Sequence, residues 1–147
     1  MDTPNLRNVS LAMACGLCLA ALAPAATADE LPTLKKGLWE FKRTVGGSAG
    51  SAKAQPIVSR ECVDPKEDMK KQNEMLTKAG CKFSPLKKSG NAYSFTADCQ
   101  IQGRHAQSKS IITVDNDSAY RVDVENKGGA QISKELLFAR RIGDCKK

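Results

Sequence analysis

Hydrophobic and polar residues alternate along much of the chain, and this pattern predicts β-strands separated by tight turns. The clearest alternation lies in residues 92–101, where the apolar residues that would share one face are Tyr93, Phe95, Ala97, Cys99 and Ile101. Similar patterns predict six further strands, at residues 37–45, 57–62, 82–86, 106–114, 120–125 and 131–142. Turn residues follow several of these strands, at residues 87–91, 115–117 and 127–129.

Because the strands follow one another through short turns, we expect an antiparallel meander of about seven strands. Each strand is apolar on one face only, so the sheet must curl on itself or be covered by another element. The pattern therefore predicts a mainly β (α+β) fold, a curled sheet or incomplete barrel with one short helix packed at an edge or end.

The helix is expected between Cys62 and Cys81. Asp64 suits the N-cap, Pro65 suits the first helical position, and Gly80 provides a left-handed stop. Glu67 completes a capping-box pattern. The apolar residues of this segment form one narrow stripe: Met69, Met75, Leu76 and Ala79.

Residues 1–28 have the pattern of an export signal. A positively charged start is followed by an apolar run, residues 11–22, and by the small-residue cleavage site Ala26-Thr27-Ala28. The run is shorter than the roughly 20 residues that span a bilayer. We therefore expect cleavage after Ala28, which removes Cys15 and Cys18 and leaves one domain, residues 29–147, without a transmembrane segment.

The expected mature chain keeps four cysteines, Cys62, Cys81, Cys99 and Cys145. In an exported protein an even number of cysteines favours disulfides, and their spacing lacks the close pairs of a structural zinc site. Three pairings are formally possible. We favour Cys62 with Cys81 across the helix, which leaves Cys99 to pair with Cys145.

The formal net charge of +7 favours contact with anionic partners, such as an anionic component of the cell envelope. The basic residues are spread along the chain and aromatic residues do not interleave with them, which argues against nucleic acid as a partner. Ordinary solvated charged faces explain the same charge without any partner.

Five aromatic residues are expected on the inner face of the sheet and could line a cavity for a small apolar ligand: Trp39, Phe41, Tyr93, Phe95 and Tyr120. The alternative is that these side chains fill a solid core.

Candidate chemistry is sparse. His105 is the single histidine, and it has neither an assigned nucleophile nor further metal ligands, so we assign no catalytic, metal or cofactor-binding residue. We therefore expect a non-enzymatic, monomeric protein. A hydrolase using a site around His105 and a purely structural or protein-partner role are the alternatives.

The order of motifs resembles the exported bacterial family known as domain of unknown function 3617 (DUF3617). The motifs are Gly37-Leu38-Trp39-Glu40, the cysteine-bracketed helix, Cys99 in a strand, and the terminal Arg141-Ile142-Gly143-Asp144-Cys145. The resemblance implies a periplasmic protein of a Gram-negative bacterium, with no established activity or site residues to transfer. The chain departs from the family in being charged after the third cysteine, at Arg104, His105, Lys109 and Arg121.

Overall fold

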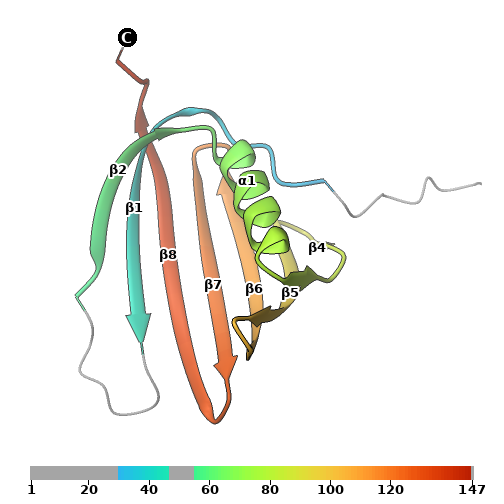
Figure 1. Ribbon diagram of the computed structural model, residues 1–147. Coiled ribbons are helices and arrows are strands. Elements are labelled where there is room, and N and C mark those ends of the chain that lie inside the picture. The colour runs from blue at the N-terminus through green and yellow to red at the C-terminus, as the bar shows by residue number, and fades with distance from the viewer. Residues whose placement is uncertain (1–29, 47–54, 147) are drawn as a thin grey trace, which may run out of the picture.

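The computed structural model describes residues 30–46 and 55–146, which form one antiparallel sheet and one helix (Figure 1). The predicted export signal, with Cys15 and Cys18, lies outside the described residues. The elements, in chain order, are β1 (Gly37–Gly46), β2 (Ile57–Val63), α1 (Pro65–Lys78), β3 (Cys81–Phe83), β4 (Lys87–Ser89), β5 (Ala92–Ile101), β6 (Arg104–Asn116), β7 (Ala119–Gly128) and β8 (Gln131–Gly143).

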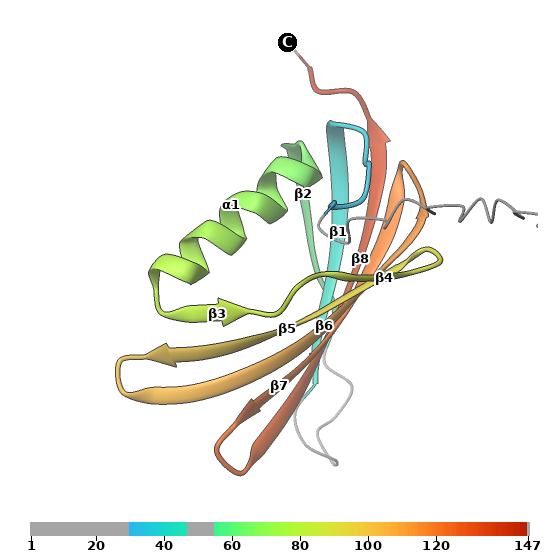
Figure 2. The same ribbon diagram turned by 90° about the vertical axis from the view of Figure 1, so that its right-hand side faces the viewer.

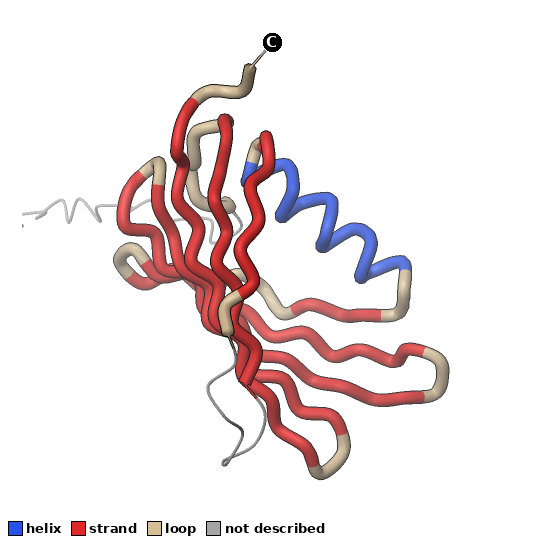
Figure 3. The backbone as a smooth tube through the Cα atoms, turned by 90° about the vertical axis from the view of Figure 1, so that its left-hand side faces the viewer, coloured by secondary structure: helices blue, strands red, loops and turns tan. Residues whose placement is uncertain are grey.

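The strand order is β2-β1-β8-β7-β6-β5-β3, with β4 also paired to β5. Strands β5 to β8 form the expected meander, whereas β1 joins the sheet beside β8, the last strand. The sheet is strongly curled and remains open (Figure 3). The predicted fold class is therefore confirmed, with eight strands in the described residues; the additional strand is β4, where the sequence predicted only a turn.

Helix α1 lies across the concave side of the sheet, with its axis inclined to the strands (Figure 2). It begins where predicted, because the Asp64 carboxylate accepts hydrogen bonds from the backbone N–H groups of Lys66 and Glu67. Gly80 follows the helix with a φ of +107°, and a Cβ atom there would lie 2.5 Å from the carbonyl oxygen of Gln100. Glycine thus allows the chain to turn tightly into β3.

The core lies at one end of the concave face. It contains Leu34, Trp39, Tyr93, Ile112, Tyr120 and Ala139. The Trp39 ring is fully buried and packs against the Tyr120 ring, with centroids 5.5 Å apart. Burial raises the pKa of Tyr120 to about 12, with a smaller effect from Asp68.

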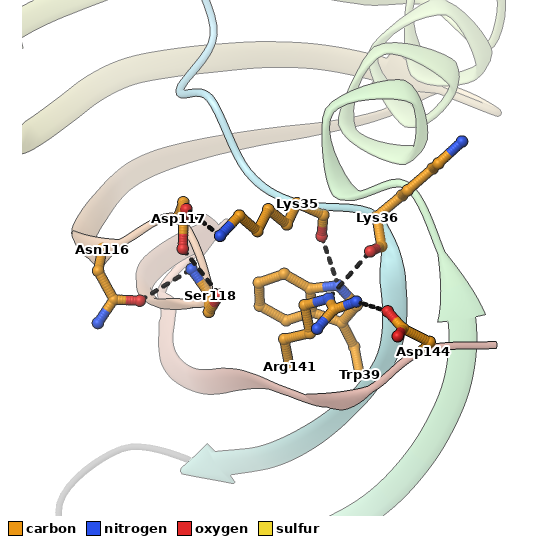
Figure 4. Close-up of polar contacts among 8 residues, drawn as sticks. All are labelled: Lys35, Lys36, Trp39, Asn116, Asp117, Ser118, Arg141 and Asp144. Atoms are coloured by element: carbon orange, nitrogen blue, oxygen red, sulfur yellow. Dashed lines mark hydrogen bonds and ion pairs between the residues drawn. The ribbon is translucent and has the colours of Figure 1, made fainter.

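Residues 30–36 cross this end of the sheet and cover the core, with Pro32 and Leu34 buried. Figure 4 shows the polar contacts that Lys35 and Lys36 of this segment make. The side chain and the backbone N–H of Lys35 both bind Asp117, each at 2.8 Å. The Trp39 indole N–H donates to the Lys35 carbonyl at 3.0 Å, and Arg141 Nε donates to the Lys36 carbonyl at 2.9 Å. The segment is therefore attached to β1, to β8 and to the β6–β7 turn.

The predicted disulfide pairing is wrong: the bonds are Cys62–Cys145 and Cys81–Cys99. Cys62 and Cys81 flank α1, whose 14 residues extend roughly 21 Å at about 1.5 Å each. Cys81 instead lies directly opposite Cys99 in the β3–β5 register. Leu38 of β1 pairs with both Cys62 and Gly143, so the chain leaving β8 needs only to cross the end of β1 to reach Cys62.

Candidate functional site

A groove with a volume of about 770 Å³ lies between the concave face of the sheet and helix α1. Its sheet wall carries apolar side chains from four neighbouring strands: Phe95, Ala97, Ile112, Val122, Val124 and Leu137. Its helix wall includes Met69 and Leu76. Concave apolar surfaces are where small molecules usually bind.

The period of two along each strand brings these side chains together. Ile112 pairs with Tyr93 on one side and Val122 on the other, and Val122 pairs with Leu137. Directly opposed residues share a face of the sheet. The apolar residues of four strands therefore form one continuous row across the concave face.

Helix α1 is close to the core only at its beginning. Met69 packs against the core cluster, whereas Leu76 and Met75, near the helix end, are 38% and 62% exposed. Leu76 still lines the groove. The helix therefore covers the sheet without filling the space beneath its second half.

The five aromatic residues predicted to line a cavity divide between two environments. Phe95 lines the groove and also packs against the core, whereas Trp39, Tyr93 and Tyr120 are buried in the core and Phe41 only packs against it. Of the five, only Phe95 is among the residues that line the groove. The physical reason is that residues 30–36 cover the end of the sheet that bears Trp39, and Leu34 of this segment is part of the core cluster there.

Sequence reasoning missed the aliphatic residues of the groove wall. The alternation of β7 already placed Val122 and Val124 on the inner face, so a signal for them existed. Met69 and Leu76 of the helix stripe carried a similar signal. Nothing in the sequence showed which inner-face residues would be packed in the core and which would line the open groove.

A bidentate ion pair borders the groove. Arg43 of β1 contacts Glu135 of β8 through Nε at 2.6 Å and through Nη2 at 2.8 Å. Glu135 lines the groove and its side chain is 20% exposed. Its hydrogen bond raises the pKa of Arg43, so Arg43 remains charged. Arg43 shares its strand face with Trp39, Phe41 and Val45, and Glu135 is the partner of this one charged residue among apolar ones.

His105 lies at the beginning of β6, at an exposed position. Its Nε2 is 3.0 Å from Asp98 Oδ1, and Gln107 Nε2 donates to the same carboxylate at 3.0 Å. The Gln107 hydrogen bond, followed by that of His105, lowers the pKa of Asp98. Among the described residues, the side chain of His105 contacts no serine, threonine or cysteine that could act as a nucleophile.

Within residues 30–46 and 55–146, no group of three or more histidine, cysteine, aspartate and glutamate side chains is arranged to hold a metal ion. All four cysteines of this region are in disulfides. No helix in the same region is long and apolar enough to cross a membrane.

A family model described as "Protein of unknown function (DUF3617)" matches residues 34–145. No curated protein and no solved structure matches the chain.

Proposed function

The chain belongs to the DUF3617 family, whose description names no activity, and on this premise we propose that it is a non-enzymatic periplasmic protein that binds a small apolar ligand, or the apolar part of an envelope component, in the groove under α1. The location is supported by the export-signal pattern of residues 1–28 and by two disulfides, which persist in oxidising compartments.

The observation that carries this proposal is the incomplete filling of the space between the sheet and the helix. Ligand pockets commonly measure about 300–1,000 Å³, and the groove of about 770 Å³ lies in this range. Its wall is aliphatic at the centre, so burying an apolar ligand there removes apolar surface of both partners from water.

Both ends of helix α1 are attached to the rest of the fold, which keeps the groove open. The Cys81–Cys99 disulfide fixes the chain just after α1 to β5, and the start of the helix directly follows β2, with Pro65 buried and Met69 packed against the core. A helix held at both ends needs no contact with the sheet along its whole length. We therefore interpret the space beneath its second half as a binding site that exists before the ligand arrives.

The test uses two neighbouring residues of β8. Leu137 lines the groove, whereas Leu136 points to the opposite face of the sheet, and both are partly buried. The mature protein is titrated with the fluorescent apolar probe N-phenyl-1-naphthylamine. Leu137→Gln should weaken binding roughly tenfold, because a polar amide is placed in the apolar wall. Leu136→Gln, the control, should bind like the wild type.

Thermal unfolding of both variants shows whether each is folded, and the isosteric Val124→Thr replaces Leu137→Gln if the latter is not. Native mass spectrometry of protein purified from periplasm should in addition reveal a bound small molecule. Failure of the wild type to bind the probe, or equal weakening by the two glutamine variants, contradicts the proposal.

A further inference from the structure

The groove has a polar end as well as an apolar one. Ser108 and Ser110 of β6 and Asn126 of β7 line it together with Glu135 of β8. Ser108 lies directly opposite Asn126, and Ser110 lies opposite Val124, which in turn lies opposite Glu135. Four polar side chains on three adjacent strands thus lie at one end of a sheet wall that is aliphatic at its centre.

Ser110 is the member of this group that points most clearly to a ligand. It is 7% exposed, and its two neighbours across the strands, Phe95 and Val124, both line the groove. Among the described residues its hydroxyl has no hydrogen-bond partner. No buried side-chain oxygen of the described residues lacks a hydrogen-bond partner, so the Ser110 Oγ atom is itself accessible at the groove surface, where a bound group can hydrogen-bond to it.

Asn126 and Ser108 extend the same polar surface. Both are partly buried, and neither side chain forms a hydrogen bond with another described residue. Serine and asparagine side chains both donate and accept hydrogen bonds. The three residues, which we call the polar wall, therefore suit a group that also has both donors and acceptors.

The charges around the groove balance one another. Glu135 is neutralised by Arg43 in the bidentate pair, with contacts of 2.6 and 2.8 Å. From the helix side, Lys70 and Glu74 line the groove with one charge of each sign. A charged head group would lose its hydration without gaining an unpaired counter-charge, and such burial is costly.

We infer that the ligand is an amphipathic molecule with an uncharged head group bearing hydroxyl or amide groups. The head binds the polar wall, and the apolar tail lies along the aliphatic row that includes Ile112, Val122 and Leu137. This inference rests on the proposed function, because it names the class of ligand that the same groove takes.

The experiment compares ligands with the same lauroyl or lauryl tail and different heads, each displacing N-phenyl-1-naphthylamine from the mature protein below its micelle concentration. Monolauroylglycerol carries hydroxyls, lauramide carries an amide, laurate is anionic and lauryltrimethylammonium is cationic. The two uncharged ligands should bind about tenfold more tightly than the two ions. A preference for one of them identifies the head as hydroxyl or amide.

Variants of the polar wall provide the second measurement. Ser110→Ala and Asn126→Leu should each weaken binding of the preferred uncharged ligand by about threefold to tenfold, the usual effect of losing one neutral hydrogen bond. Binding of the apolar probe itself should change little. Thr113→Val, on the opposite face of β6, is the matched control and should leave every affinity unchanged.

The two proposals can fail separately. Equal affinities for charged and uncharged heads, or unchanged affinities in Ser110→Ala and Asn126→Leu, would overturn the inference about the head group while binding of the apolar probe still stands. If neither the apolar probe nor any lauroyl or lauryl compound binds the wild type, the proposed function itself is wrong.

Discussion

Glu40 of β1 accepts two hydrogen bonds from Arg60 of β2, from Nε at 3.0 Å and from Nη2 at 2.8 Å, although the Glu40 side chain is only 9% exposed. Arg140 of β8 approaches the other carboxylate oxygen at 3.5 Å. The three residues lie opposite one another in the sheet register. A single carboxylate therefore links three strands, including the edge strand β2.

This arrangement predicts how stability depends on pH. The Arg60 hydrogen bond lowers the pKa of Glu40 from its ordinary value of 4.5, so the ionised carboxylate stabilises the fold above that value. The stabilisation is lost as pH falls through the lowered pKa. Glu40→Gln should therefore be less stable than the wild type at neutral pH, and the difference should shrink in acid. Urea unfolding at a series of pH values measures both.

Asp123→Asn is the control for this experiment, because Asp123 pairs with Arg121 at a side chain that is 49% exposed. Exposed ion pairs contribute little, so this variant should unfold nearly like the wild type at each pH. A constant difference between Glu40→Gln and the wild type at all pH values would show that the carboxylate charge of Glu40 is not what stabilises the sheet.

The disulfide pairing gives a prediction for each bond. Proteolysis without reduction should release linked peptides containing Cys62 with Cys145, and Cys81 with Cys99. On the loop-entropy model, removing the first bond with Cys62→Ser and Cys145→Ser should cost about 4.5 kcal/mol, and removing the second about 3 kcal/mol, because the first closes the longer loop. Denaturant unfolding of the two double variants measures this order.

A linked peptide that joins Cys62 to Cys81 would contradict the strand order as well as the pairing. Cys62 lies beside β1, whereas Cys81 lies beside β5, and the sheet order separates these strands by β8, β7 and β6.

Sequence reasoning succeeded where a feature depends on neighbouring residues. The N-cap at Asp64, the stop at Gly80 and the inner face of β5 each follow from local chemistry, and the structure has all three. The strand patterns also predicted a curled sheet or incomplete barrel, because one-sided apolar strands cannot remain flat and exposed, and the sheet is curled and open.

The features that sequence reasoning missed depend on residues far apart in the chain. The pairing of β1 with β8 brings Arg43 to Glu135 and brings Cys145 near Cys62, and no local pattern specifies that pairing. The same holds for the groove, since burial of Trp39 depends on Leu34 and on a turn at Asp117. Alternation shows which face a side chain occupies and not whether that part of the face is filled.

Trp39 provides a direct test of which part of the concave face is solid. It is the single tryptophan of the chain and is 0% exposed, with its indole N–H bound to the Lys35 carbonyl. Its fluorescence should therefore be blue-shifted and resist quenching by iodide. Saturation of the groove with monolauroylglycerol should leave the emission unchanged, because the groove is lined by Phe95 and not by Trp39. Trp39→Phe should cost roughly 2 kcal/mol of stability through lost packing and the lost hydrogen bond, which thermal unfolding measures. Strong iodide quenching in the folded protein would instead mean that the aromatic end is hollow, which is one of the two arrangements that the sequence left open.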